Sequence, residues 1–390
     1  DLNKMTIGTL GNAVDFGDLS VARHHPGANS NTIRGCFGGG YDPNASNVID
    51  YFQLASGGTC VDFGNLQAVT SNMYSQPSPG GGGILQDVLQ RPSVNYMPGS
   101  GRALFGGGYV SPTHTTNINL NHIPTLGNST DFGDLTAEFA NMGSYSSLTR
   151  GFFIAGDNPS TAMNAIEMAS QGNCFDFGDT TTARDTGPGG NSSSTRGVLG
   201  GGGGPAAPST SNVIDYVTMA TAGNASDFGD LTLARIAVGG NANSPTRSVF
   251  TAGLTPSSSN VMDYVTTATT GDATDFGDMA NSVGYSKGMS SVTRAVLAGG
   301  ETPTLQNQIS YITIASTGDT SDFGDLAAAK SQNGSASNRI RGLSAGGKTP
   351  SQINVIEYVT IASTGDAADF GDLIALTTKI TGCSDSHGGL

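Results

Sequence analysis

The chain lacks tryptophan and is poor in charge. Only 12% of its 390 residues are charged, and its 17 lysines and arginines are scattered, without a basic run that could neutralise successive phosphates. Nucleic acid is therefore not an expected partner. No stretch approaches the ~18 consecutive apolar residues of a membrane-spanning helix, so membrane insertion is not expected either.

Cysteine is also scarce. Cys36, Cys60, Cys174 and Cys383 have no CxxC spacing and lie far apart in the chain, which argues against a zinc site. We predict isolated buried thiols, with a disulfide left open. The chain begins at Asp1 rather than Met and shows no signal-peptide pattern, which leaves open a domain or signal peptide before residue 1.

Glycine is the abundant residue, with 58 copies in a chain that is 36% hydrophobic. This composition indicates an all-β, loop-rich protein. Disorder is a poor alternative, because runs such as NVIDYVTIA recur and carry the β-branched and aromatic residues that strands prefer.

A four-residue motif, DFGD or once DFGN, recurs along the whole chain. Most copies follow one another after 45 to 51 residues, and one interval is 69. The motif holds 15 of the 31 acidic residues, so much of the net charge of −14 belongs to the repeat. A period of this length is typical of repeat architectures. The copies begin at Asp15, Asp62, Asp131, Asp176, Asp227, Asp275, Asp322 and Asp369.

Two further landmarks complete the repeat. An arginine followed by small, apolar and glycine residues precedes each motif after the first, and a segment such as NVIDYVTIA lies between them in most repeats. With a small-residue segment in front, each unit offers four short strands separated by turn residues. The arginines are Arg34, Arg102, Arg150, Arg196, Arg247, Arg294 and Arg341.

Four short strands in about 47 residues predict the blade of a β-propeller, whose innermost strands crowd a narrow axis and favour small side chains. The Arg-led strand ending in paired glycines, the strand centred on Asp-Tyr and the Leu-x-x-Ala-Arg run (Leu19 to Arg23, Leu231 to Arg235) resemble the kelch repeat. The resemblance implies four-stranded kelch-like blades. One departure is that the phenylalanine of DFGD stands where kelch units usually have tryptophan.

The amino-acid sequence of the repeat resembles repeat proteins of tailed phages of marine bacteria. The resemblance lies in NVIDYVTIASTGDA followed by DFGDL and in the C-terminal CSDSHGGL. That resemblance implies a virion or tail-fibre component.

The repeat count predicts one propeller over residues 1–390 with eight blades, and seven as the alternative. The first unit, from Met5, supplies only third and fourth strands, and the C-terminal LTTKITGCSDSHGGL matches a first strand. We therefore predict that the N- and C-terminal strands pair in one blade, which hides an open sheet edge. The long interval predicts a loop insertion at residues 70–101.

The repeated charges have structural explanations. The DFGD aspartates are suited to turns and to capping backbone N–H groups, with calcium binding as a minor alternative, and no other cofactor or metal is expected. We expect each repeat arginine to pair with a DFGD aspartate. A kelch-like copper oxidase is an alternative that needs converging His, Tyr and Cys, and the sequence shows no such grouping. We predict that the protein is not an enzyme.

Binding is expected where the chain departs from its repeat, because loops on a rigid scaffold vary without cost to the fold. Exposed aromatic side chains there can stack on sugars or anchor a protein interface. The candidate binding residues are Tyr41, Tyr74, Gln90, Arg91, Tyr96, Tyr109 and His114.

The expected function is a structural or host-adhesion module of a phage virion, located on the particle or outside the cell. Its expected partners are other virion proteins or a host-surface glycan or protein, and a homo-oligomer is possible. The first alternative is a cellular extracellular propeller that binds carbohydrate or protein, and the second is the copper-oxidase-like enzyme.

Overall fold

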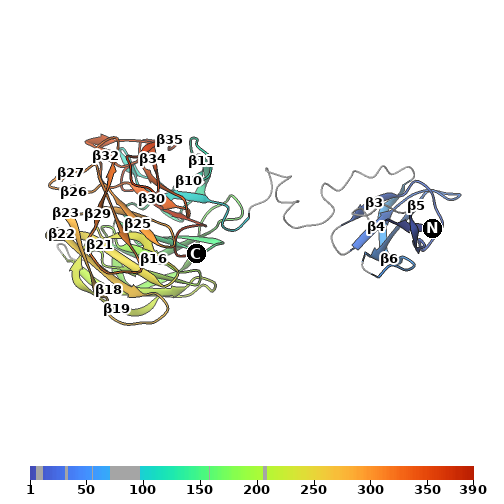
Figure 1. The fold of residues 1–390 in the computed structure, drawn as a ribbon, viewed down its shortest axis with the longest axis horizontal. Helices are drawn as coiled ribbons and strands as arrows, with labels where there is room; N and C mark the ends of the chain where they lie inside the picture. Colours follow the sequence, from blue (N-terminus) through green and yellow to red (C-terminus); the bar gives the residue numbers. More distant parts are fainter. Residues whose placement is uncertain (6–11, 31–33, 55, 71–96, 158, 205–208) are drawn as a thin grey trace. The chain divides into compact units, whose positions relative to one another are not determined.

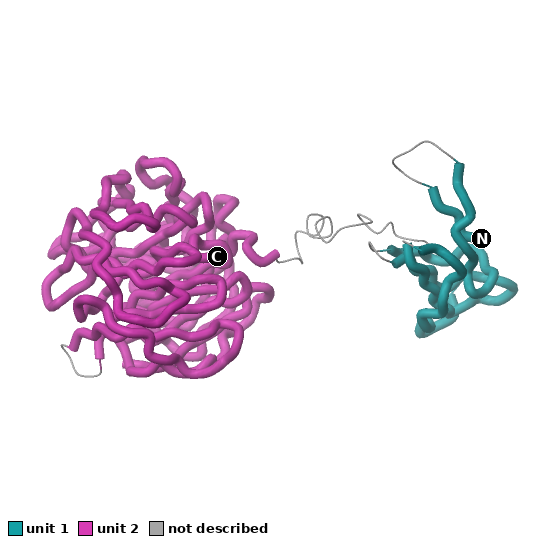
Figure 2. The backbone as a smooth tube through the Cα atoms, turned by 60° about the horizontal axis from the view of Figure 1, so that its bottom comes forward, with its two compact units in different colours: residues 1–95 teal, residues 96–390 magenta. Residues whose placement is uncertain are grey.

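A computed structural model describes residues 1–5, 12–30, 34–54, 56–70, 97–157, 159–204 and 209–390. The chain divides into two compact units, Asp1–Asn95 and Tyr96–Leu390, coloured separately in Figure 2. Each unit is described by itself. All regular elements in the described residues are β-strands, as the composition predicts, and none is a helix.

The C-terminal unit contains six four-stranded antiparallel sheets (Figure 1). The first comprises β7 (Arg102–Gly106), β10 (Asn117–His122), β11 (Thr130–Asp134) and β36 (Thr381–Ser384). The second comprises β12 (Gly143–Ser146), β13 (Arg150–Ile154), β14 (Ser160–Glu167) and β15 (Phe175–Arg184). The third comprises β16 (Gly189–Ser192), β17 (Arg196–Gly200), β18 (Ser211–Thr218) and β19 (Ser226–Arg235).

The other three sheets repeat this pattern. The fourth comprises β20 (Gly239–Asn243), β21 (Arg247–Thr255), β22 (Ser257–Thr266) and β23 (Thr274–Val283). The fifth comprises β24 (Lys287–Ser290), β25 (Arg294–Ala298), β28 (Gln308–Thr313) and β29 (Ser321–Asp325). The sixth comprises β30 (Gly334–Ser337), β31 (Arg341–Ala345), β34 (Val355–Thr360) and β35 (Ala368–Asp372).

Each predicted segment of the repeat forms one strand of a sheet. The small-residue segment is the first strand, the arginine opens the second, the Asp-Tyr segment is the third and DFGD lies in the fourth. The first strands neighbour one another in a circular order: β12, β16, β20, β24, β30, β36 and again β12. Neighbouring first strands pack closely against each other: a Cβ on Gly190 of β16 would lie 2.1 Å from the carbonyl oxygen of Ser144 of β12. This crowding explains the small residues of the first strand.

The N-terminal unit contains one complete repeat and half of another. Its four-stranded sheet comprises β3 (Gly27–Ser30), β4 (Arg34–Gly38), β5 (Ser46–Gln53) and β6 (Val61–Thr70). A separate antiparallel pair consists of β1 (Leu2–Lys4) and β2 (Val14–Gly17). The pair corresponds to the third and fourth strands that the sequence predicts for the incomplete first repeat.

Successive sheets of the C-terminal unit are joined through the DFGD strand. The carbonyl oxygen of its phenylalanine accepts a hydrogen bond from a glycine N–H in the turn between the third and fourth strands of the next sheet. These bonds run from Gly172 to Phe132, Gly223 to Phe177, Gly271 to Phe228, Gly318 to Phe276, Gly365 to Phe323 and Gly127 to Phe370. The last bond links the sixth sheet to the first.

The C-terminal strand corrects one prediction. Thr381–Ser384 pairs with β7, whereas within the described part of the chain β1 and β2 pair only with each other, so the predicted sheet shared by the two chain ends is wrong. The physical reason is that no small-residue first strand stands directly before Arg102 in the sequence, so β7 has an open edge that β36 fills. The described residues consequently form seven four-stranded sheets, where the sequence predicts eight.

The prediction of a single domain over residues 1–390 stays a prediction, since each unit is described by itself. Most of the predicted loop insertion at residues 70–101 lies outside the described residues.

Candidate functional site

Short hairpins follow the glycine pairs of the C-terminal unit and connect the second strand of a sheet to the third. Three of them form their own two-stranded sheets: β8 (Tyr109–Val110) with β9 (Thr113–His114), β26 (Glu301–Thr302) with β27 (Thr304–Leu305), and β32 (Lys348–Thr349) with β33 (Ser351–Gln352). A proline occupies each tip, at Pro112, Pro303 and Pro350. Proline fixes φ, so these tips are suited to holding one conformation. We call this end of the unit the hairpin face.

Two predicted binding residues, Tyr109 and His114, lie together on the first hairpin. Their rings meet edge to face, with centroids 5.7 Å apart. The backbone of Tyr109 is held by Gln352, whose Nε2 donates to the Tyr109 carbonyl oxygen at 2.7 Å. The hairpins of the first and sixth sheets are therefore linked to each other.

Asp157 lies next to this aromatic pair. One of its carboxylate oxygens is 3.7 Å from Nε2 of His114 and 2.9 Å from Nζ of Lys379. The other accepts a hydrogen bond of 2.7 Å from Nδ2 of Asn141. The chain thus brings together an aromatic pair, a carboxylate, an amide and an ammonium group, a set that can both stack on and hydrogen-bond a polar ligand.

A second polar group on the hairpin face is centred on Glu301. Its Oε2 accepts from Nζ of Lys348 at 3.0 Å and from the hydroxyl of Ser331 at 3.0 Å. The pKa of Tyr285 is raised by burial first and then by the charges of Glu301, Asp157 and Asp185. Tyr285 therefore lies near enough to Glu301, Asp157 and Asp185 to be affected by their charges, and its phenol stays protonated at neutral pH.

Lys287, at the start of β24 and two residues after Tyr285, carries an ammonium group of altered acidity. Burial lowers its pKa to about 8, so the ammonium form is no longer favoured overwhelmingly at neutral pH. Sequence reasoning missed these residues, because Tyr285 and Lys287 belong to one repeat and Asp157 to another.

The other predicted binding residues do not join this site. Tyr41 belongs to the N-terminal unit, is 41% exposed and has its ring centroid 5.3 Å from that of His24. It occupies the same position of its repeat as Tyr109, directly after the glycine pair. Tyr74, Gln90, Arg91 and Tyr96 lie outside the described residues.

The repeat arginines do not have the partners that we expected. Nη1 of Arg247 donates to the carbonyl oxygens of Ile314 and Ala315 in the next sheet, at 3.1 and 2.9 Å. Its guanidinium lies over the ring of Tyr264, 4.4 Å from the centroid. Arg150, Arg196, Arg294 and Arg341 reach carbonyls of the following sheet in the same way. For these five, the predicted pairing with a DFGD aspartate is wrong, because two carbonyls that end a strand already form a ready acceptor.

The DFGD aspartates have backbone roles. In the motifs that begin at Asp15, Asp62 and Asp176, Oδ1 of the first aspartate accepts from the glycine N–H two residues later. The glycine itself is required, because Gly229 has φ of +143° and a Cβ there would lie 2.5 Å from the carbonyl oxygen of Gly271. The motif therefore belongs to the joint between sheets.

Buried ion pairs join neighbouring sheets and were missed by sequence reasoning. Arg235 pairs with Asp263 at 2.5 Å, Arg184 with Asp215 at 2.6 Å, and Lys330 with Glu357 at 2.6 Å. Arg23 and Asp50 make the equivalent pair in the N-terminal unit, at 2.9 Å. In each pair, the cation ends the segment after DFGD and the acid lies in the third strand of the next repeat.

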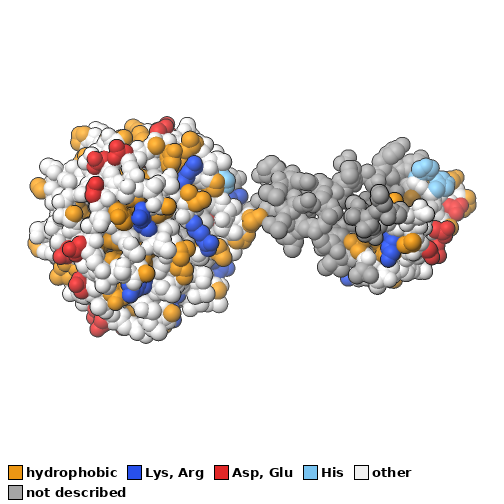
Figure 3. Space-filling model, in the orientation of Figure 1, with side chains coloured by type: hydrophobic (Ala, Val, Ile, Leu, Met, Phe, Trp, Pro, Cys, Tyr) orange, Lys and Arg blue, Asp and Glu red, His pale blue; other side chains and the backbone are white. Residues whose placement is uncertain are grey.

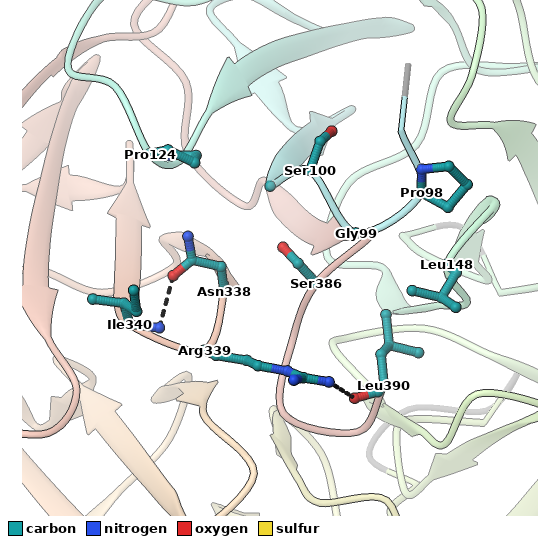
Figure 4. A pocket seen from close by; sticks show the side chains of 11 residues that line it. Pro98, Gly99, Ser100, Pro124, Leu148, Asn338, Arg339, Ile340, Ser386 and Leu390 are labelled. Atoms are coloured by element: carbon teal, nitrogen blue, oxygen red, sulfur yellow. Dashed lines mark hydrogen bonds between the residues drawn. The ribbon is translucent and has the colours of Figure 1, made fainter. Parts of the chain in front are cut away.

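A pocket of about 410 Å³ lies beside the C-terminal tail (Figure 4). Its rim is apolar, with Leu148, Ile340 and Pro124, and its polar groups include Asn338 and Arg339. Nη2 of Arg339 donates to the carbonyl oxygen of Leu390 at 3.1 Å, as the dashed line in Figure 4 shows. The chain end is thereby tied to the wall of this pocket.

His387, in the same tail, is buried as a neutral ring. Its Nε2 lies 3.1 Å from the carbonyl oxygen of Ser146, and its Nδ1 accepts from the N–H of Gly389 at 3.1 Å. Burial lowers its pKa to about 4, against a smaller opposing effect of the Ser146 carbonyl. A second proton would have to sit on Nδ1, against the N–H of Gly389.

This ring predicts a loss of stability in mild acid. Because the folded pKa lies below the ordinary histidine value of 6.5, the unfolded chain binds the proton first, and stability falls as the pH drops from about 6.5 to about 4. The loss attributable to His387 is about 3 kcal/mol, and it is absent above pH 6.5. Denaturant unfolding at pH 7 and pH 4 should show a larger drop for the wild type than for His387→Gln. Equal drops would show that this ring is not responsible.

The charged surface of the C-terminal unit has no basic patch on the face that Figure 3 shows; the blue side chains there are isolated from one another. Among the described residues, no group of three or more His, Cys, Asp or Glu side chains is arranged to hold a metal ion. No helix long and apolar enough to cross a membrane occurs in the described part of the chain.

No protein-family model matches the chain, and no curated protein is significantly similar to it.

Proposed function

We propose that the described part of the C-terminal unit is a closed six-bladed β-propeller in which each four-stranded sheet is one blade. The support is the circular order of the first strands, together with the Gly127–Phe370 bond that links the sixth sheet to the first. In this proposal β36 closes the ring by completing the sheet of β7. The eight-bladed count would then overestimate the ring by the repeats of the N-terminal unit.

The propeller serves as a non-enzymatic scaffold that presents its hairpin face to a glycan. The observation that carries this proposal is the edge-to-face pair of Tyr109 and His114 beside Asp157. Sugar rings offer a C–H face that stacks on an aromatic side chain and hydroxyls that bind carboxylates and amides. Asp157 and Asn141 supply such polar groups beside the aromatic pair.

The setting of this module is a phage virion, where it acts in adhesion to the host surface or contacts neighbouring virion proteins. The support is the resemblance of the repeat to kelch units and to repeat proteins of marine tailed phages. Mass spectrometry of purified particles should detect the chain in a fixed ratio to the capsid protein. Particles that lack it, beside a cell fraction that contains it, would favour the cellular extracellular propeller instead.

Replacing Tyr109 by Ala is expected to lower glycan affinity at least tenfold, since loss of a central aromatic contact typically costs more than 1.4 kcal/mol. The measurement is binding to a glycan array, followed by calorimetry on the best ligand. Phe175→Ala is the control, because Phe175 is an exposed aromatic residue of the same unit that lies in the fourth strand of a sheet, whereas Tyr109 is half-buried on a hairpin. Equal losses in both variants, or no glycan bound by the wild type, would reject the glycan-binding role.

A further inference from the structure

The phenylalanine of the DFG motif has one environment in the C-terminal unit and another at Phe63. In the six sheets of the C-terminal unit this side chain is only 1 to 3% exposed: Phe132, Phe177, Phe228, Phe276, Phe323 and Phe370. Phe63, in β6 of the N-terminal unit, is 57% exposed. Val69 of the same strand is also exposed. The fourth strand of this sheet therefore presents an uncovered apolar face.

The structure shows repeatedly what covers such a face. In the C-terminal unit it is the turn between third and fourth strands of the next repeat, which places two N–H groups on the DFGD backbone. At Phe228, the N–H of Gly271 donates to the Phe228 carbonyl oxygen at 2.7 Å, and that of Ala273 donates to Asp230 at 2.8 Å. The same joint occurs once inside the N-terminal unit, where Gly58 donates to Phe16 at 2.8 Å and Cys60 to Asp18 at 2.7 Å.

A complementary turn is left uncovered in the same unit. Asn12 and Ala13, which precede β2, occupy the positions of Asn224 and Ala225 in the repeat, and both are exposed. Val14, the next residue, is 54% exposed. Ala225, by contrast, packs against a hydrophobic core in the C-terminal unit. Among the described residues of the N-terminal unit, one face, at Phe63, and one turn, at Asn12 and Ala13, are thus uncovered.

The exposed face at Phe63 and the exposed turn at Asn12 and Ala13 are complementary, and this complementarity indicates which partner binds them. In the described C-terminal unit, all six DFGD strands are already bonded to the six turns of that unit. Within one N-terminal unit, the free turn and the free face belong to different repeats, at the two ends of the Phe16–Gly58 joint. The face and the turn therefore correspond to the two ends of a short array of repeats. The face of one chain can bind the turn of a second copy of the chain.

We propose that the exposed face of β6 around Phe63 docks the turn at Asn12 and Ala13 of a second copy of this chain, head to tail. The joint is the one that the repeat makes elsewhere: apolar packing of Phe63, and the N–H of Ala13 donating to the backbone carbonyl of residue 65, as that of Ala273 does to Asp230. Such a contact joins two different surfaces, so it must close into a ring or grow into a filament.

The number of copies follows from the repeat, and this step rests on the proposed propeller. Six repeats complete the circle of the proposed propeller, so each repeat is rotated by about 60° about the propeller axis relative to the one before it. An N-terminal unit contains two DFG strands and therefore covers about 120° of such a circle. Three copies close the ring.

Light scattering of the full chain after size exclusion should give a mass of about 118 kDa, three times the 39.4 kDa of one chain. Phe63→Asp should give 39.4 kDa at every concentration, and Phe63→Leu should stay trimeric. Phe63→Asp should keep the melting temperature of the C-terminal unit, whereas Phe228→Asp, which places the same charge in a buried joint, should lower it. A wild-type monomer overturns the proposal.

Photo-crosslinking identifies the docked surface independently of the mass. A benzophenone amino acid at position 63 of the full chain should form crosslinks between chains that map to residues 12–18. Crosslinks within one chain to residues 97–390, or none at all, overturn the second-copy partner. Failure of the closed propeller would leave these crosslinks in place and change only the expected mass, so the two failures are distinguishable.

Discussion

Deletion of residues 381–390 is expected to abolish the cooperative unfolding transition of the C-terminal unit. The deletion removes β36, which supplies the first strand of the sheet of β7 through the register Thr381 to Gly106 through Ser384 to Ala103. It would leave β7, a buried strand, with an open edge and unpaired backbone groups. Differential scanning calorimetry of the full chain measures the transition directly.

The deleted strand also connects its two neighbours. The hydroxyl of Ser146 donates to the Ser384 carbonyl oxygen at 2.7 Å, and the hydroxyl of Ser384 donates to the carbonyl oxygen of Ser337. Cys383 packs in one core with Leu104 and Phe153. Loss of this strand therefore breaks contacts on both sides at once, and the circular order of first strands is interrupted.

A graft provides the control that separates ring closure from general damage. The segment Gly189–Thr195 connects directly to Arg196 in the third sheet, so a copy of it placed directly before Arg102 would offer β7 a first strand from its own side. The graft should restore a cooperative transition to the deletion variant. A deletion variant that melts like the wild type would show that β36 does not close the structure.

The partner of the C-terminal strand could not be chosen from the sequence. Two repeats lack a first strand of their own, the one at Met5 and the one at Arg102, and a small-residue segment such as TGCS fits either. The four strands of each repeat were predictable, because alternation and turn residues are local properties. The choice between two open edges depends on how many sheets complete a circle, which is a property of packing.

The candidate site was predictable only in part. Tyr109 and His114 stand out because they interrupt the repeat after a glycine pair. Asp157 and Tyr285 lie in other repeats, and only the circular order of the sheets brings them near. The arginine partners were mispredicted for a related reason, since backbone carbonyls leave no signal in a sequence.

The buried ion pairs did leave a signal, because the two positions change together along the chain. Where the third strand carries an acid, as at Asp263, the preceding repeat ends in a cation, as at Arg235. Where the third strand carries Ser310, the corresponding residue is Val283, and where it carries Asn164, it is Phe139. The joint therefore exists in this chain in a charged and in a neutral form.

Replacing only Arg235 or only Asp263 should strongly lower the free energy of unfolding. Burial raises the pKa of Asp263 and lowers that of Arg235, so each charge depends on its partner for compensation in a site that excludes water. Arg235→Val or Asp263→Ser should each lower the free energy of unfolding by about 3 to 5 kcal/mol, because the remaining charge is left buried and unpaired. Denaturant unfolding of the single variants measures this loss.

The double variant carrying Arg235→Val and Asp263→Ser reproduces the Val283 and Ser310 combination of the following repeat. Its stability should return to within about 1 kcal/mol of the wild type, because both the desolvation cost and the attraction between the charges are removed together. The coupling between the two substitutions is then several kcal/mol, which only direct contact between neighbouring sheets can produce. Additive losses in the double variant would mean that the two positions do not act as one joint.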